Sequence, residues 1–204
     1  GGTLMVGVGG DPPSLDVHRE ETNFNFSIVA GTYNGLVKFD PQAWPETKLL
    51  PDLATSWDLS PDGKVYTFRL VKGAKFHDGS TLTAEDAKYS FDRMRDPQLG
   101  LVKSPRRQQL ANVSGIETPD DSTVKITLNE PQASFLPYIA TFYNAVVSKK
   151  VTLEKKGDLT KTVVGTGAFK FKDYSGGVGW EIQKNPNYYV PGRPYLDGVK
   201  GYII

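Results

Sequence analysis

The stretch SWDLSPDGKVYTFRL, residues 56–70, constrains the fold more than any other part of the chain. In the tight turn Ser60–Gly63, proline presets the dihedral of the second position and glycine tolerates a positive φ at the end. Tyr66, Phe68 and Leu70 then alternate with other residues, so one face of this strand is predicted to be buried. The stretch therefore predicts a β-hairpin that lies on a hydrophobic core.

Other parts of the chain carry local signals of the same kind. Further hairpins are expected to turn at residues 119–121 and 175–177, each between alternating segments. Helices are expected at 84–95 and 134–141. The strands expected outside the hairpins are residues 3–9, 144–150 and 199–204. Hairpins mixed with helices indicate an α/β or α+β fold that contains antiparallel sheet.

The composition narrows the function classes. The chain has 204 residues, which suits one domain or one large and one small subdomain. Its formal net charge is +1, so the basic excess of a nucleic-acid binder is missing and no nucleic-acid partner is expected. It has no cysteine, which removes thiol catalysis, disulfides and cysteine-based zinc sites. No stretch is apolar for long enough to predict a membrane helix.

The stretch AKFHDGSTLTAEDA, residues 74–87, places His77 beside Asp78 and so raises the possibility of a hydrolase. Local structure explains the same residues: Asp78-Gly79 is a turn dipeptide. Thr83 stands where a helix N-cap is expected, with Asp86 three residues later as in a capping box. We therefore interpret this stretch as the end of a strand, a turn and the start of a helix.

Motifs that would carry catalysis or bind a cofactor are missing from the sequence. There is no G-x-S-x-G elbow for a nucleophile, and the two histidines, His18 and His77, lack the H-x-x-x-H spacing of a zinc site. The glycine-rich stretches at residues 7–10 and 165–170 complete neither G-x-G-x-x-G nor a P-loop. No catalytic residue, metal site or cofactor is predicted.

Five separated segments, in order, resemble the family 5 extracellular solute-binding proteins, the oligopeptide, dipeptide and nickel binding components of ABC importers. The longest, residues 50–94, runs from LPDLATSWDLSPDGKVYTFRL to the helix that begins after Thr83. The others are GVGGDPPSLDVH with TYNGLVKFD near the start, TVKITLNEPQASFLPYIA, VGTGAFKFKDYSGGVGWEIQKNPNYY, and PYLDGV. The resemblance spans essentially the whole chain.

The resemblance implies a fold: an α/β lobe of the type II periplasmic-binding-protein kind, with a mixed sheet and an extra hairpin-rich subdomain. Residues 1–44 and 165–204 would form the larger sheet subdomain, and residues 45–164 the extra subdomain with two hairpins and the Thr83-capped helix. Members of the family are longer and have two lobes. The chain is therefore expected to be the N-terminal lobe only, cut in or just after a strand, with its second lobe missing.

The resemblance also implies a function, which is the capture of a small solute, most simply a peptide, for delivery to an ABC permease in the membrane. The expected partners are this ligand, the permease and the missing second lobe. The protein is not expected to be an enzyme. It is expected to be periplasmic or extracellular, and the full-length protein could carry a lipid anchor. In peptide-binding members, the charged groups that hold peptide termini lie mainly in the second lobe.

Ligand contacts from this lobe are expected after the first strand and in turns that face the cleft. Carried over by resemblance, the candidate ligand-binding residues are Thr22, Asn23, Phe24, Tyr143, Asn144, Thr166 and Gly167. Two alternatives remain open beside solute binding: a hydrolase that uses His77 and Asp78, and a protein-interaction module.

Overall fold

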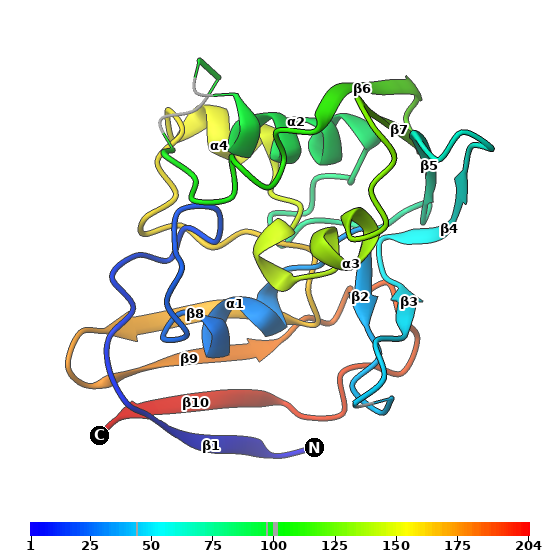
Figure 1. Cartoon of the computed structure of the whole chain (residues 1–204). Helices are drawn as coiled ribbons and strands as arrows, with labels where there is room; N and C mark the ends of the chain where they lie inside the picture. Colours follow the sequence, from blue (N-terminus) through cyan, green and yellow to red (C-terminus); the bar gives the residue numbers. More distant parts are fainter. Residues whose placement is uncertain (44, 97, 100–101) are drawn as a thin grey trace.

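The computed structural model describes residues 1–43, 45–96, 98–99 and 102–204. The chain forms two four-stranded sheets and one two-stranded sheet, with short helices packed against them (Figure 1). This mixed α/β architecture is the one expected from the sequence.

The first sheet joins the two ends of the described chain. Its strand order is β1-β10-β9-β8, and β1 pairs in parallel with β10 while the other pairs are antiparallel. Helix α1 (Phe26–Thr32) packs on β8 and β9 (Figure 1). The strands of this sheet are β1 (Thr3–Val8), β8 (Phe169–Ser175), β9 (Gly179–Lys184) and β10 (Gly198–Ile203). The hairpin expected around residues 175–177 is confirmed as β8–β9.

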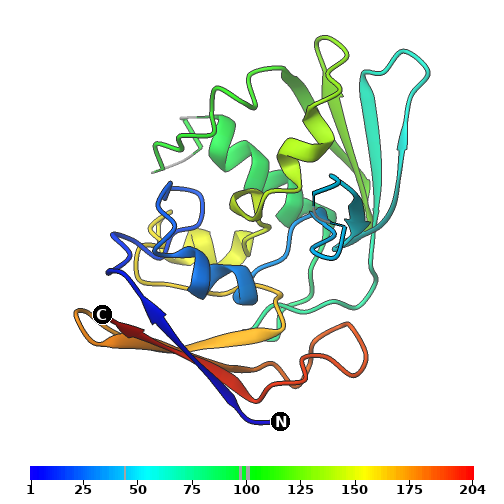
Figure 2. The ribbon, with the colours of Figure 1, turned by 60° about the horizontal axis from the view of Figure 1, so that its bottom comes forward.

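The second sheet contains the other two expected hairpins. Its order is β4-β5-β7-β6, all antiparallel, and it stands apart from the first sheet in Figure 2. Tyr66, Phe68 and Leu70 of β5 are all 5% exposed or less, because their face of the strand packs on the core. The strands are β4 (Ala54–Leu59), β5 (Val65–Leu70), β6 (Val113–Asp120) and β7 (Thr123–Leu128).

Helix α2 (Ala84–Arg95) matches the expected helix, including its start. The Asp86 carboxylate reaches back to accept a hydrogen bond from the backbone N–H of Thr83 at 3.0 Å, as a capping box requires. The apolar side of α2 packs on β6 and β7. The remaining elements are β2 (Val37–Phe39), β3 (Leu49–Pro51), α3 (Phe135–Ile139), the 3₁₀ helix η1 (Phe142–Asn144) and α4 (Lys149–Glu154).

The strand expected at residues 144–150 is wrong. Residues 145–148 form no regular structure, and α4 begins at Lys149 with Ser148 as its N-cap. The apolar run is buried for another reason. Val146 and Val147 are at most 1% exposed and cross the interior, where the backbone N–H of Val146 donates to the carbonyl of Asn34 at 2.9 Å. Burial of an irregular segment gives the same apolar sequence as a short buried strand.

Two hydrophobic clusters stabilise the chain. The larger lies between the second sheet and α2, and the smaller lies under α1 against β9. Leu36 and Val37 belong to the larger cluster, and Val147 and Val163 belong to the smaller.

The division into a sheet subdomain and an extra subdomain at residues 45–164 stays a prediction. Among the described residues, no helix has the length and apolar character needed to cross a membrane.

Candidate functional site

Two segments far apart in the sequence meet beside α1. The Tyr143 hydroxyl donates hydrogen bonds to the carbonyls of Glu21 at 3.2 Å and Thr22 at 3.3 Å. The ring of Phe142 lies 3.8 Å from that of Tyr143 and 4.6 Å from that of Phe26, in an edge contact. We call Phe26, Phe142 and Tyr143 the aromatic patch. Phe26 is 46% exposed, so the patch presents an apolar surface to solvent.

Phe24 extends this region toward the first sheet. Its side chain is 41% exposed, and its ring lies against Gly10, where an added Cβ would come within 3.3 Å of the ring. Gly10 follows the carboxyl end of β1. Because β1 and β10 are parallel, their carboxyl ends meet at the same edge of the sheet, on the left of Figure 1. Open α/β sheets bind ligands outside the carboxyl ends of their strands, so Phe24 lies at a favourable edge.

The structure thus brings together Thr22, Asn23, Phe24 and Tyr143 among the candidate residues. Asn144 is fully buried instead, and its amide donates to the carbonyl of Tyr138 at 2.9 Å and to Thr141 Oγ1 at 2.8 Å. These internal contacts fix the turn that presents Tyr143. A role for Asn144 in binding a ligand stays a prediction.

Thr166 and Gly167 also lie in the interior. Thr166 is fully buried and donates to Asn34 Oδ1 at 3.1 Å. The backbone N–H of Gly167 donates to the carbonyl of Thr32 at 3.0 Å, which ties the segment before β8 to the end of α1. Asn34 in turn binds the buried carboxylate of Asp52, which borders a pocket of about 250 Å³ that also reaches Phe142. The role of Thr166 and Gly167 as ligand contacts stays a prediction.

Replacing Gly167 with alanine should destabilise the protein. An added Cβ would lie 2.4 Å from the carbonyl carbon of Thr32 and 2.5 Å from the carbonyl oxygen of Gly31, and both of these neighbours are backbone atoms. We expect Gly167→Ala to lower the free energy of unfolding by about 1–3 kcal/mol, measured by urea denaturation of the full-length protein. Gly115→Ala is the matched control, since its Cβ would meet nothing within 4 Å. Equal stability of the two variants would contradict this packing.

Three charged side chains beside the aromatic patch were not among the candidate residues. The guanidinium of Arg106 lies 3.9 Å from the centre of the Tyr143 ring. Burial raises the pKa of Glu20, which is 7% exposed, and lowers the pKa of Arg106. Glu20 and Glu21 both act on Arg106 through their charge. The candidate site therefore combines an apolar surface with one cation and two carboxylates.

Asp78 has the local role expected for it, whereas the ring of His77 is held by a distant segment of the chain. Nε2 of His77 donates to the carbonyl of Gly167 at 3.1 Å, and Nδ1 accepts from the backbone N–H of Gly165 at 3.3 Å. Both ring nitrogens are thus engaged by backbone, and burial lowers the pKa of His77 to about 4. Asp78 accepts from the backbone and hydroxyl of Ser80 inside its turn. Nothing in these contacts supports the hydrolase alternative.

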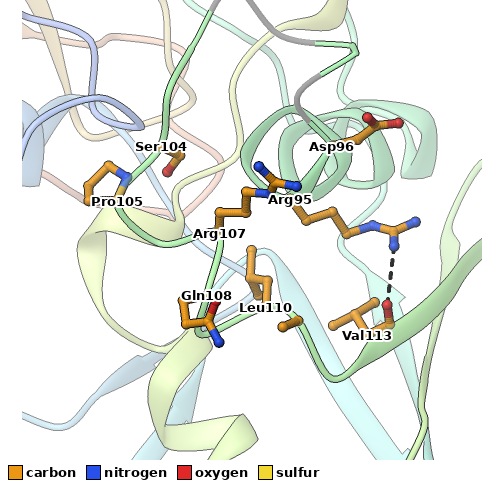
Figure 3. A pocket seen from close by; sticks show the side chains of 9 residues that line it. Arg95, Asp96, Ser104, Pro105, Arg107, Gln108, Leu110 and Val113 are labelled. Atoms are coloured by element: carbon orange, nitrogen blue, oxygen red, sulfur yellow. Dashed lines mark hydrogen bonds between the residues drawn. The ribbon is translucent and has the colours of Figure 1, made fainter.

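A more voluminous pocket than the one beside Asp52 lies elsewhere, at the end of α2 (Figure 3). It encloses about 610 Å³, and none of the candidate residues lines it. Arg95, which points across it, is already held by the carbonyl of Val113 at 3.1 Å and by Asp92 at 2.7 Å. Within the described ranges, no group of three His, Asp or Glu side chains could hold a metal ion.

The sheet, its helices and the open aromatic surface at its edge define part of a lobe of a periplasmic binding protein. The model of the bacterial extracellular solute-binding proteins, family 5 (middle), matches residues 48–204, and the chain belongs to this family. The predicted resemblance and fold class are thereby confirmed.

Relatives and solved structures agree on the class. The chain is 38% identical over 184 residues to an ABC transporter peptide-binding protein of Brucella ovis, covering 86% of this chain and 34% of the relative. It is 32% identical to the di/tripeptide-binding protein 1 of Pseudomonas aeruginosa, covering 93% of this chain and 38% of the relative. The chain thus spans little more than a third of their length.

Among solved structures, the binding protein AgaA of A. tumefaciens R10, in complex with agropinic acid, superposes with a TM-score of 0.91 at 34% identity. DppA of Helicobacter pylori, in complex with the peptide STSA, superposes with a TM-score of 0.89 at 32% identity. Both matches cover all of this chain but only 40% and 43% of the solved chains. The structure described here therefore corresponds to about two fifths of each of these solved chains.

Proposed function

We propose that the full-length protein is the substrate-binding component of an ABC importer and that it captures a short peptide for delivery to a membrane permease. The observation that carries this proposal is the exposed aromatic patch, with Phe24 beside it at the carboxyl edge of the first sheet. An apolar surface with a few polar groups is what a small-solute site requires. The printed names of the relatives point to peptides as the ligand class.

We propose that Thr22, Asn23, Phe24 and Tyr143 touch the ligand, while Asn144, Thr166 and Gly167 hold the surrounding backbone in place. A second lobe would cover the aromatic patch and enclose the ligand. Closure is favoured when the ligand binds the closed state more tightly than the open one. Binding of this kind needs no covalent chemistry, which agrees with the transport class of the family.

The family name places its members outside the cytoplasmic membrane. We propose the same location for this protein, where a binding component meets its solute before the permease does. The lipid anchor stays a prediction. The permease and the second lobe are the partners that the function requires.

A thermal-shift screen of the full-length protein tests the proposal. An equimolar mixture of dipeptides and tripeptides should raise the melting temperature, since ligand at a hundred times Kd stabilises the folded state by about 2.7 kcal/mol.

Phe24→Ala should weaken peptide binding about tenfold, because an exposed aromatic wall is lost. Tyr195→Ala is the control, because Tyr195 is also exposed (65%) but is not part of the candidate site.

Two outcomes would count against peptide capture. The first is stabilisation by agropinic or mannopinic acid, the ligands of two structural neighbours, without any stabilisation by peptides. The second is an equal loss of affinity in Phe24→Ala and Tyr195→Ala, which would place the ligand away from the proposed surface.

A further inference from the structure

A groove of about 560 Å³ lies at the opposite end of the first sheet from Phe24. Its main wall is the loop between β9 and β10, which stands at the amino end of β10 (Figure 1). None of the candidate ligand-binding residues lines this groove. Most of its lining is aromatic or aliphatic, and two cations complete it. We call it the basic groove, formed chiefly by Lys38, Phe169, Tyr188, Arg193, Tyr195 and Leu196.

The loop that walls the basic groove is held in place from within. Asn185 is 2% exposed, and its side-chain amide donates to the carbonyl of Gly167 at 2.9 Å. The Tyr189 hydroxyl donates to Asp52 Oδ1 at 3.2 Å. The Tyr188 ring packs against the Tyr189 ring, with their centres 4.8 Å apart. The groove is therefore preformed, which lowers the entropic cost of binding a ligand.

The two cations of the basic groove differ in their surroundings. The Lys38 ammonium lies 3.1 Å from Asp52 Oδ1, so this carboxylate compensates its charge. Among the described residues, Arg193 has no carboxylate within 4.0 Å, and no acidic side chain lines the groove. The Arg193 guanidinium instead lies over the Tyr195 ring, 4.0 Å from its centre. Both side chains are exposed, so a ligand can reach an uncompensated positive charge beside an apolar wall.

We propose that the basic groove is a second ligand site, separate from the peptide site, and that it binds a small amphipathic anion such as an aromatic carboxylate. The anionic group accepts hydrogen bonds from Arg193, whose planar fork matches two carboxylate oxygens. The apolar body lies on Phe169, Tyr188 and Leu196, where the loss of exposed apolar surface favours binding. Stacking on Tyr195 keeps the guanidinium in one plane, so little side-chain freedom is lost. A concave, mostly apolar surface with a few polar groups is typical of small-molecule sites.

The test compares two probes that differ in charge, 2-naphthoate and 2-naphthamide, by calorimetry on the full-length protein. The unaltered protein should bind the naphthoate about tenfold more tightly, because the amide lacks the charge-assisted pair with Arg193. Arg193→Gln should remove most of this preference and leave the affinity for the amide nearly unchanged. Arg193→Lys keeps the charge without the planar fork and should retain part of the preference. Arg107→Gln, which alters an exposed arginine outside the groove, should retain all of it.

A second arm of the experiment locates the probe. The pocket beside Asp52 shares Lys38, Phe169 and Tyr188 with the basic groove and reaches Phe142, so the two sites must be separated by experiment. The naphthoate should bind equally well in Phe24→Ala and in the presence of the dipeptide and tripeptide mixture.

Each other outcome is assigned in advance. Displacement of the naphthoate by peptides, or its loss in Phe24→Ala, would place the probe in the candidate site and overturn the second site. Failure of the unaltered protein to bind the naphthoate, equal affinity for the two probes, or a preference that survives in Arg193→Gln would also overturn it. If peptides do not bind at all, the proposed function fails, whereas the basic groove is still tested by Arg193→Gln and Phe24→Ala.

Discussion

Asp16→Ala should destabilise the protein by about 3–5 kcal/mol, because it leaves a buried guanidinium without its counter-charge. Asp16 is 1% exposed and Arg93 is fully buried. The two side chains form a double hydrogen bond, with distances of 3.0 Å from Nη1 and 2.6 Å from Nη2. This pair joins α2 to the segment after β1, so its loss should loosen the lobe near the candidate site.

Urea denaturation of the full-length protein, followed by circular dichroism, measures this loss. Lys172→Met is the control, because Lys172 pairs with Glu181 on the surface and such pairs contribute about 1 kcal/mol or less. The double variant Asp16→Leu with Arg93→Met should regain much of the lost stability, since an apolar pair of similar volume needs no counter-charge. A loss below about 1 kcal/mol in Asp16→Ala would show that the buried pair contributes little.

The protein should also lose stability as the pH falls from about 6.5 to about 4. Burial is the main cause that lowers the pKa of both His18 and His77 from 6.5 to about 4. In this window the unfolded chain binds protons at both histidines while the folded chain does not, so stability falls with pH. Each histidine contributes a loss of up to about 3 kcal/mol, complete near pH 4.

Unfolding free energies at pH 7 and pH 4.5 test this in the unaltered protein and in His18→Gln and His77→Gln. Glutamine can replace the hydrogen bonds that Nε2 donates to Ala145 and Gly167, but it does not titrate. Each variant should therefore show a smaller loss between the two pH values than the unaltered protein. If both variants lose as much as the unaltered protein, other groups cause the acid sensitivity.

Much of the fold could be predicted from the sequence because its signals are local. The turn at Ser60–Gly63 and the cap at Thr83 depend only on neighbouring residues, and both were predicted correctly. The parallel pairing of β1 with β10 has no local signal, because the two strands lie at opposite ends of the given sequence. The strand predicted at residues 144–150 was wrong because an apolar run reports burial rather than conformation.

The candidate site was predicted less completely for the same physical reason. Thr22 to Phe24 and Tyr143 came from the family resemblance, and the structure brings these segments together. Arg106 lies in the polar stretch SPRRQQL, which has the composition of a solvated loop. Nothing in that stretch indicates that one arginine is buried against Tyr143 while its neighbour Arg107 is exposed. The pair of Asp16 with Arg93 is likewise invisible, because 77 residues separate them.

The pairing of β1 with β10 has a consequence for the time course of folding. The first strand pairs with one that is synthesised about 195 residues later, which at about 5–20 residues per second takes on the order of 10–40 s. During this delay β1, with its apolar side chains, has no neighbouring strand. An unpaired strand edge can pair with another chain, and for β1 this exposure lasts until β10 emerges. Pairing at such a distance also makes closure of the first sheet a late and slow step.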